Sequence, residues 1–245
     1  MRIITTAIIK GGTGKTTTAA ALAQAGITAG KKILAVDMDP QGNLSAMLAA
    51  DIEKPGSYEL LTGTAAISEA IQETGQGIPI IAASPNLASV KAKPGSARLL
   101  QDAIEPIKED YDLILIDTPP QAGILVFTAL QASTGLIIPL EADTNSLQGM
   151  YHIADIARQI QQSNDALSFT GVIITRYDAR PNLNRYLMQT IKEKAEAEQI
   201  PYLGEVRTGI AIKEAQAMQV SLYEYAPRSK PAQDYETIFR KIMEG

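Results

Sequence analysis

The residue types between Lys10 and Thr17 are those that bind phosphate groups. This segment, Lys-Gly-Gly-Thr-Gly-Lys-Thr-Thr, follows an apolar run and precedes an Ala-rich stretch. Glycines let the backbone curve so that successive N–H groups point inward, and the N-terminus of a following helix adds positive charge. In such a loop Lys15 reaches the β- and γ-phosphates of a nucleotide and the Thr16 hydroxyl ligates Mg²⁺. The alternative, a simple glycine-rich turn between strand and helix, does not explain the Gly-Lys-Thr ending. The predicted cofactor-binding residues of the loop are Lys10, Gly11, Gly12, Thr13, Gly14, Lys15, Thr16 and Thr17.

Two carboxylates follow the apolar run 32–37. Asp37 and Asp39 are spaced i, i+2, and Pro40 and Gly42 then turn the chain. Ligands of α/β proteins bind at the carboxyl ends of the strands, so both side chains are expected beside the phosphate loop. The alternative is an Asp-Pro turn in which an Asp caps the next helix.

A third acidic residue ends the apolar run 113–116. An apolar strand that ends in Asp is the Walker B arrangement, in which Asp117 holds Mg²⁺ through its water shell, because Mg²⁺ takes few protein ligands. The loop and the two acidic strand ends together predict a site for ATP and Mg²⁺.

Apolar runs rich in β-branched residues alternate with segments of helical period along the chain. Runs such as 113–116 are apolar on both faces, which is typical of parallel strands covered by helices on both sides. We therefore expect an α/β fold, a single doubly wound, mostly parallel sheet with helices on both faces, as in P-loop NTPases. The expected strands are 3–9, 32–37, 78–83, 113–117, 135–140, 171–175 and 201–206. The expected helices lie near 15–29, 43–50, 96–109, 122–132, 146–163, 183–198, 210–218 and 232–243.

The division of the chain into domains follows from the same pattern. Residues 51–95 are the least regular part, because Pro and Gly punctuate short segments there, and we expect them to be surface elaboration. No repeat or linker interrupts the chain, so residues 1–245 are expected to form a single P-loop ATPase domain.

Composition excludes several classes of chemistry. Among 245 residues there is no Cys and one His, which excludes disulfides, thiolate zinc sites, iron–sulfur clusters and a cysteine nucleophile. No apolar stretch approaches the roughly 18 residues of a membrane span, and we expect a cytoplasmic protein. The net charge of −5 excludes a uniformly basic nucleic-acid coat. Residues 1–150 hold 10 Lys+Arg and 15 Asp+Glu, whereas residues 151–245 hold 12 of each, so a basic surface is expected only in the C-terminal part.

The phosphate loop departs from the ordinary pattern, which has Gly at position 9, because Ile9 stands there and Lys10 follows. It resembles the deviant Walker A motif of the ParA/MinD superfamily of dimerising ATPases, and most of the chain is similar to the ParA family of plasmid and chromosome partition ATPases. The segments that carry this resemblance are Asp37-Met38-Asp39-Pro40-Gln41-Gly42-Asn43, Asp117-Thr118-Pro119-Pro120, Thr175-Arg176-Tyr177-Asp178, and the run from Ile212 to Tyr235.

The resemblance implies an ATP hydrolase that works as a switch. In outline, ATP closes a sandwich homodimer that binds DNA non-specifically, and a ParB-like centromere-binding adaptor stimulates hydrolysis. Such a protein would associate with the nucleoid. Met1 stands almost directly before the first strand, so no N-terminal DNA-binding extension is expected.

The resemblance also implies roles for individual residues. Lys10 corresponds to the signature lysine that crosses the dimer interface to the partner's phosphates, although a contact within its own chain and a solvated surface charge remain alternatives. Lys10, Lys15 and Asp39 are the implied catalytic residues, with Asp39 orienting the attacking water. The implied metal residues are Thr16, Asp37, in the outer shell, and Asp117. Thr175-Arg176 and Val206-Arg207 stand at strand ends where the superfamily cradles adenine, and Thr175 and Arg207 are the implied binding residues.

Other members of the superfamily offer alternative functions. The nitrogenase iron protein needs cysteines, which are lacking here. A related ATPase that positions another cargo has the same motifs. A MinD-like membrane-cycling ATPase ends in a basic amphipathic helix, but residues 232–243 carry few cations on their polar face. We therefore expect this helix to dock on the protein's own core, and no membrane partner.

The predicted DNA surface is the least specific inference from the sequence. Cations in the C-terminal part could neutralise DNA phosphates, and a dimer doubles their number. Acidic residues are interspersed among them, and Ala211 stands where many ParA proteins have an arginine used for DNA. The candidate DNA-binding residues are Arg185, Lys192, Arg207 and Lys213.

Overall fold

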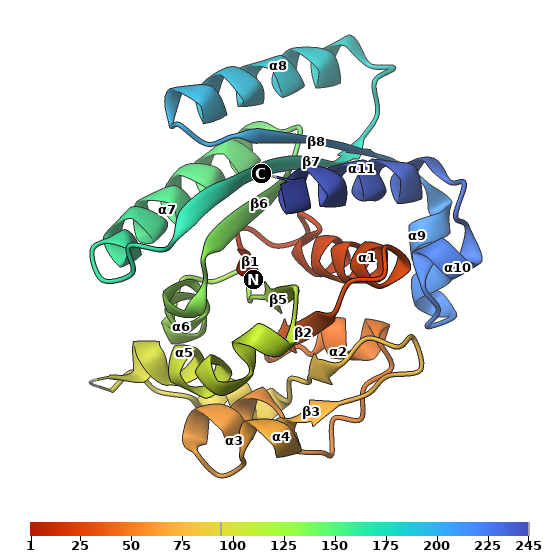
Figure 1. The fold of residues 1–245 in the computed structure, drawn as a ribbon. Coiled ribbons are helices and arrows are strands. Elements are labelled where there is room, and N and C mark those ends of the chain that lie inside the picture. The colour runs from red at the N-terminus through yellow and green to blue at the C-terminus, as the bar shows by residue number, and fades with distance from the viewer. Residues whose placement is uncertain (94, 245) are drawn as a thin grey trace.

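An eight-stranded sheet organises the fold in the computed structural model, which describes residues 1–93 and 95–244 (Figure 1). The strand order is β3-β4-β2-β5-β1-β6-β7-β8, and only the β3–β4 pair is antiparallel among the described pairings. The strands are β1 (Arg2–Thr6), β2 (Ile33–Asp37), β3 (Ile71–Gln72), β4 (Ile80–Ile81), β5 (Leu113–Asp117), β6 (Gly135–Glu141), β7 (Ser168–Tyr177) and β8 (Tyr202–Arg207). The predicted doubly wound, mostly parallel sheet is confirmed.

Helices cover both faces of this sheet. They are α1 (Lys15–Thr28), α2 (Asn43–Met47), α3 (Ser57–Thr62), α4 (Ile67–Ala70), α5 (Leu99–Ile104), α6 (Ile124–Ala132), α7 (Thr144–Gln161), α8 (Asn182–Ala197), α9 (Ile210–Ala217), α10 (Leu222–Tyr225) and α11 (Lys230–Glu244). Three 3-10 segments, Pro85–Ser89, Ser96–Arg98 and Glu105–Asp110, complete the described elements. Within the described ranges, no helix has the length and apolarity that crossing a membrane requires.

Successive residues of the central strands pack into hydrophobic clusters on opposite faces of the sheet. Leu113 and Leu115 pack into the cluster formed with α1, α9 and α11, whereas Ile114 packs into the cluster formed with α3 to α6. This alternation follows from the period of two in a strand. Because both sets are apolar, the strand is buried on both sides, as its composition predicts.

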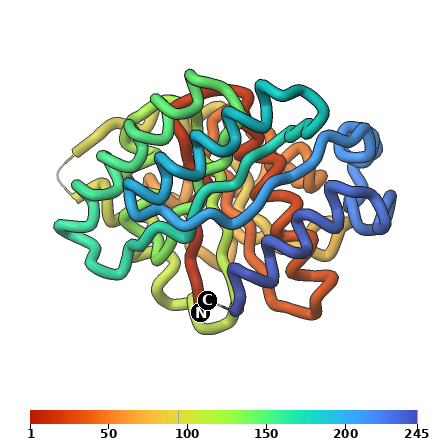
Figure 2. The backbone as a smooth tube through the Cα atoms, turned by 90° about the horizontal axis from the view of Figure 1, so that it is seen from above, coloured from red at the N-terminus to blue at the C-terminus, as the bar shows by residue number. Residues whose placement is uncertain are grey.

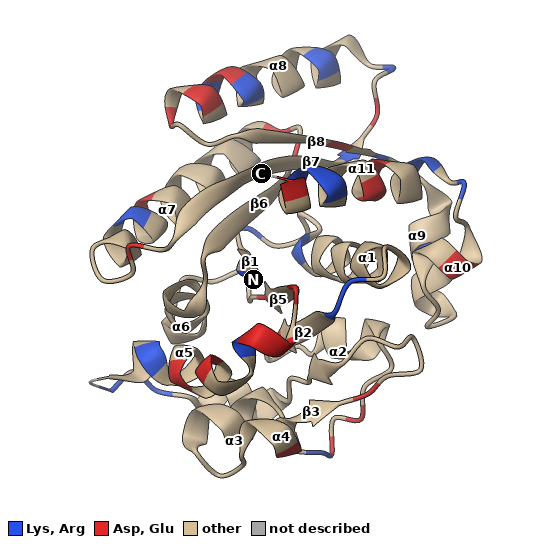
Figure 3. Cartoon of the chain, viewed as in Figure 1, with Lys and Arg blue, Asp and Glu red and all other residues tan. Residues whose placement is uncertain are grey.

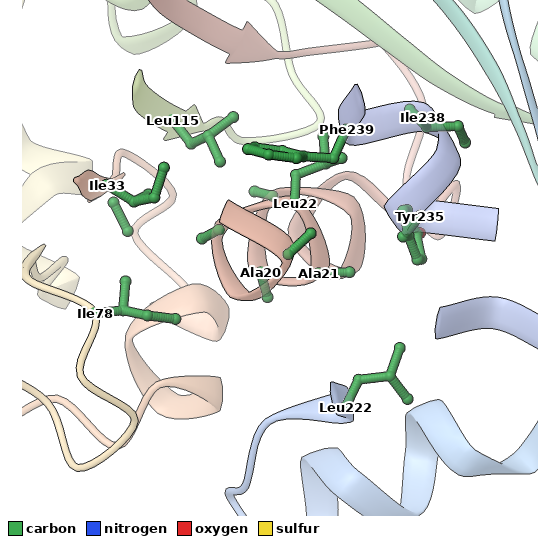
Figure 4. Packing of buried hydrophobic residues seen from close by; sticks show 14 of the residues in the cluster. Ala20, Ala21, Leu22, Ile33, Ile78, Leu115, Leu222, Tyr235, Ile238 and Phe239 are labelled. Atoms are coloured by element: carbon green, nitrogen blue, oxygen red, sulfur yellow. The ribbon is translucent and has the colours of Figure 1, made fainter. Parts of the chain in front are cut away.

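The amphipathic C-terminal helix docks on the protein's own core. Tyr235, Ile238, Phe239 and Ile242 are at most 3% exposed. They pack in the same cluster as Leu22 of α1, and Figure 4 shows Phe239 and Tyr235 facing α1. Figure 2 shows the same neighbourhood from above, with the dark blue α11 beside the red α1. The expected docking of this helix is confirmed.

The region 51–95 is more than surface elaboration, so that expectation is wrong in part. Leu60, Leu61 and Leu87 are buried in the cluster beneath β2 and β5, and β3 and β4 extend the sheet. Apolar residues in very short elements build this core, which explains why periodicity misses it.

The expected helix at 96–109 is interrupted. Its ends are 3-10 segments around α5, and Pro106 lies at the start of the second segment. Proline lacks the N–H that a continuing α-helix needs, which accounts for the break.

Candidate functional site

The carboxyl ends of β1, β2 and β5 bring together residues that are distant in sequence. In the parallel register Asp117 lies beside Thr6 of β1 on one side and Asp37 of β2 on the other. The phosphate loop leaves β1 at this same edge. The strand pairing therefore assembles the predicted loop and carboxylates into one site.

Glycines shape the phosphate loop. Gly12 and Gly14 have φ values of 77° and 87°, which glycine adopts without the steric cost that other residues incur. A Cβ atom on Gly14 would lie 3.4 Å from Cγ2 of Thr175, so the loop backbone packs closely on the end of β7. The N–H of Thr18 donates to the Gly14 carbonyl at 2.8 Å, which starts α1 immediately after the loop.

Lys15 places a cation inside this loop. The residue is only 6% exposed, and its Nζ donates to the carbonyl of Lys10 at 3.0 Å. Burial lowers the pKa of Lys15, while the charges of Asp117 and Asp39 oppose that shift. The ammonium group is thus desolvated and close to two carboxylates, which makes it a strong partner for an incoming phosphate.

Asp37 and Asp39 differ in how they are held. The carboxylate of Asp37 is fully buried and accepts hydrogen bonds from the N–H and hydroxyl of Ser45 at 2.8 and 2.7 Å. Burial raises the pKa of Asp37, and the bonds from Ser45 counteract this shift. Asp39 accepts from the N–H of Gln41 at 3.0 Å and lines the cavity in front of the loop. The N–H of Asp39 also donates to Oδ1 of Asp37 at 3.1 Å, so Asp37 orders the turn that presents Asp39.

Asp117 fits a magnesium site. It is fully buried, Thr6 donates to its Oδ1 at 3.3 Å, and its Oδ2 has no hydrogen-bond partner among the described residues. Burial raises its pKa, and the charge of Asp37 raises it further. An unpartnered buried carboxylate oxygen is costly, and a divalent cation nearby offsets that cost. Thr16 lies in the adjacent loop and offers the hydroxyl oxygen that Mg²⁺ prefers.

The described residues do not form a closed metal cage. No group of three or more His, Asp or Glu side chains that could hold an ion occurs within 1–93 and 95–244. This arrangement suits Mg²⁺, which keeps several waters and binds through a few protein oxygens and substrate phosphates.

Two adjoining cavities border the loop. One of about 350 Å³ is lined by Gly11 to Thr17, Asp39, Gln41 and Asn43, and we call it the phosphate cavity. The other, of about 280 Å³, lies between the ends of β7 and β8 and contains Thr175, Arg207 and Tyr235 in its lining; we call it the nucleoside cavity. Thr175 and Arg207, expected on the adenine side, therefore lie at the second cavity.

The amino group of Lys10 is held beside the loop. Its Nζ contacts both carboxylate oxygens of Asp143, at 2.6 and 2.8 Å, and the hydroxyl of Ser146 at 3.0 Å. Partial burial would raise the pKa of Asp143, but the bonds from Lys10 and Ser146 hold it below its ordinary value. Asp143 also accepts from the N–H of Ser146 as the N-cap of α7, so this ion pair is fixed to a helix terminus.

Sequence reasoning missed Asp143 and Gln216 at this edge, and it placed Arg176 only at a strand end on the adenine side. Asp143 had a recognisable signal, because Asp three residues before Ser at the start of a helical segment indicates an N-cap. Arg176 and Gln216 line both cavities, yet they come from β7 and α9, far from the loop in sequence. Only the crossovers of the sheet bring them to the loop.

The four candidate DNA residues lie in two places, two on α8 and two in the lining of the nucleoside cavity. Lys192 on α8 lies over the ring of Tyr202, 4.2 Å from its centre, and Arg185 contacts Asn182 near the start of the same helix. Arg207 and Lys213 instead line the nucleoside cavity. Arg207 binds both carboxylate oxygens of Asp234. Figure 3 shows positive and negative segments interleaved along α8.

A parallel sheet with a glycine-rich loop between β1 and α1, and an Asp at the end of a neighbouring strand, defines the class of P-loop nucleotide hydrolases. The sequence profile of a family described as AAA domain matches residues 1–169. The sporulation initiation inhibitor protein Soj of Bacillus subtilis (strain 168) is 32% identical over 242 residues, which cover 95% of this chain and 94% of that protein.

Two further proteins are similar to this chain over nearly its whole length. The chromosome-partitioning ATPase Soj of Thermus thermophilus is 30% identical, with 99% of this chain and 96% of that protein covered. A crystal structure of cobyrinic acid a,c-diamide synthase from Mycobacterium smegmatis with bound ADP and magnesium is similar with a TM-score of 0.80 and 28% identity, covering 96% of this chain and 91% of that one. The chain belongs to the AAA domain family and, within it, to the ParA family of partition ATPases.

Proposed function

We propose that this ATPase is a switch that uses ATP and Mg²⁺ to position DNA. ATP-bound chains pair as a sandwich homodimer, the dimer binds DNA non-specifically, and a ParB-like adaptor stimulates hydrolysis in plasmid or chromosome segregation. The observation that carries this proposal is the convergence of Lys15, Asp39 and Asp117 on one edge of the sheet beside the phosphate cavity.

Each residue of the edge has a role in phosphoryl transfer, which depends on positioning and charge neutralisation more than on covalent chemistry. Lys15 and the loop N–H groups bind the β- and γ-phosphates. Bound Mg²⁺ supplies positive charge to the phosphates. Thr16 and Asp117 would hold this ion, and Asp37 would act on it through water. Asp39, in the lining of the phosphate cavity, orients the attacking water.

Lys10 links nucleotide binding to dimerisation. In the single chain Asp143 and Ser146 hold its amino group beside the loop. In the dimer Lys10 exchanges this partner for the phosphates bound to the partner subunit. The side chains of Lys10 and Asp143 are 26% and 36% exposed, so solvent screens the pair and it can be exchanged.

Size-exclusion chromatography with Mg²⁺ and ATP, compared with ADP, tests the switch. We expect ATP alone to convert the monomer to a dimer, because only its γ-phosphate completes the interface. Lys10→Ala should still bind ATP as a monomer and fail to dimerise. Lys31→Ala, which removes an exposed lysine beyond the other end of α1, is the matched control. A Lys10→Ala protein that dimerises and hydrolyses ATP like the wild type would exclude the role across the interface.

Exposed cations support the DNA-binding part of the proposal. Arg185 and Lys213 are exposed, and a two-fold dimer presents two copies of each. Counterion release makes such binding steeply dependent on salt. Sedimentation with DNA should therefore require ATP and decline as salt rises. Equal binding with ATP and ADP would contradict a nucleotide-gated DNA surface.

A further inference from the structure

Arg176 lies in a bulge of β7 at the boundary between the phosphate cavity and the nucleoside cavity. Ile174 pairs with Glu205 and Tyr177 with Arg207, so β7 has one residue more than β8 between these pairs. Arg176 has a φ of 51°, in the left-handed region that residues with a side chain adopt at a cost. Bulges beside functional sites redirect a side chain, and here the exposed Arg176 stands between the buried Thr175 and Tyr177.

The backbone of Arg176 differs from the other described residues of this kind. Ala49, Gln199 and Gln219 also have positive φ, but each lies just beyond the end of a helix, where a left-handed residue is common. Arg176 lies inside a strand and terminates no helix. Strain of this kind persists where the surrounding structure enforces it, often at ligand sites.

The bulge gives Arg176 a position shared by both cavities. Among the described residues, Gly14, Thr17, Arg176 and Gln216 line both the phosphate cavity and the nucleoside cavity, and Arg176 is the charged member of this set. A nucleotide that spans the two cavities must pass its phosphate chain across this boundary.

The guanidinium of Arg176 already has an anionic partner. Its Nη1 lies 2.8 Å from Oε1 of Glu141, the last residue of β6. The two side chains are 61% and 33% exposed, so solvent screens their attraction and the pair costs little to break. A phosphate offers the same planar guanidinium two acceptor oxygens and a larger charge.

We propose that Arg176 contacts the phosphate chain of the bound nucleotide and that Glu141 holds its guanidinium until nucleotide enters. This inference rests on the proposed function, since it assigns a further binding residue to the same site. Glu141 and Asp143 then have parallel tasks. Glu141 ends β6 and Asp143 caps α7 two residues later, and each holds one cation, Arg176 or Lys10, at the rim of the phosphate loop.

Neutralising Glu141 distinguishes a purely structural role of the ion pair from competition with nucleotide for Arg176. If the pair only stabilises the strand ends, Glu141→Gln weakens nucleotide binding or leaves it unchanged. If Glu141 competes with nucleotide for Arg176, Glu141→Gln strengthens binding, and the gain depends on Arg176. A double-mutant cycle separates this effect from general repulsion between Glu141 and phosphate, which would persist without the arginine.

The test is equilibrium binding of fluorescent ADP and ATP analogues to the full chain, with thermal unfolding to confirm that each variant folds. Arg176→Gln should weaken the affinity for both analogues about tenfold, because a charge-assisted contact is lost. Glu141→Gln should tighten it about threefold, as expected for releasing a partly exposed pair. In the Arg176→Gln background the second substitution should have no effect.

Arg180→Gln is the matched control. Arg180 lies in the connection from β7 to α8 and pairs with Asp178. Its side chain is 90% exposed, and it lines neither cavity. Affinity should stay at the wild-type value. Wild-type affinity in Arg176→Gln, or a gain from Glu141→Gln that survives in the double variant, would overturn the role of Arg176 and leave the proposed function intact. Absence of nucleotide binding by the wild type would instead overturn the proposed function, and this inference with it.

Discussion

The edge around the phosphate loop and the outer face formed by α8 and the connection that precedes it use charge in opposite ways. At the loop edge Lys15 and Asp39 are 6% exposed, and Asp37 and Asp117 are fully buried. On the outer face Arg180 has a side chain that is 90% exposed and pairs with Asp178, and the exposed Arg185 contacts Asn182. The first region concentrates desolvated charges around one point, whereas the second distributes solvated charges along a surface.

The difference shows where large functional effects are expected. Charges in a region of low dielectric interact strongly and are held in place, so removing one changes binding or chemistry by orders of magnitude. Solvated ion pairs contribute little individually, and a surface of this kind works through the number of its cations. The following experiments test this contrast, beginning with the largest effect.

Lys15→Ala should give the largest change. Without the buried ammonium group, ATP affinity should fall on the order of 10³-fold, because Asp39 and Asp117 then repel the phosphates unopposed. Isothermal titration calorimetry measures this loss, with Lys31→Ala as the control. Tight binding of ATP by Lys15→Ala would show that the loop is not the phosphate site.

Asp39→Ala should separate hydrolysis from binding. Turnover should fall on the order of 10²-fold, as expected for removing a water-positioning carboxylate, while ATP stays bound. Phosphate release measures the rate. Asp51→Ala is a matched control, because Asp51 accepts a hydrogen bond from the N–H of Glu53 as Asp39 does from that of Gln41, but lies outside the phosphate cavity. Unchanged turnover would assign the water to another group.

Phe239→Ala tests how much the docking of α11 on α1 contributes to the stability of the core beneath the loop edge. Phe239 is 3% exposed and packs on α1, the helix that carries the phosphate loop. Its truncation should reduce the free energy of unfolding by about 3 to 5 kcal/mol, from lost burial and the cavity left behind. Denaturant unfolding of Ile210→Ala, at an apolar residue that is 66% exposed, should show almost no change. Similar losses in both variants would contradict the docking of α11 as a major source of stability.

Arg185→Ala should give the smallest effect. Loss of one exposed cation per chain should weaken ATP-dependent DNA binding a few-fold and reduce the salt dependence by about one counterion per lost contact. Lys108→Ala removes a partly exposed cation, paired with Glu105, from the acidic N-terminal part, and should leave DNA binding unchanged. Equal effects from both variants would mean that the C-terminal part has no special DNA surface.

The sequence predicted the loop edge far better than the outer face, for a physical reason. Gly12, Gly14 and Lys15 follow one another along the chain, and their local chemistry suffices to predict a phosphate loop. Asp37 and Asp117 end apolar strands, and the topology rule for parallel sheets places such ends together. The contact of Lys192 on the outer face has no comparable signal, because its position over the ring of Tyr202 depends on how α8 docks on β8.

The amino-acid sequence by itself determined the phosphate loop, the acidic strand ends, the parallel sheet and the apolar stripe of α11. Each of these follows from local spacing or from periodicity. Only the tertiary structure decided that Asp143 holds Lys10, that Glu141 holds Arg176, and that the bulge in β7 brings Arg176 to the rim of both cavities. Such contacts join elements through strand register and crossovers, and a one-residue change in register redirects a side chain without altering the pattern that predicts the strand.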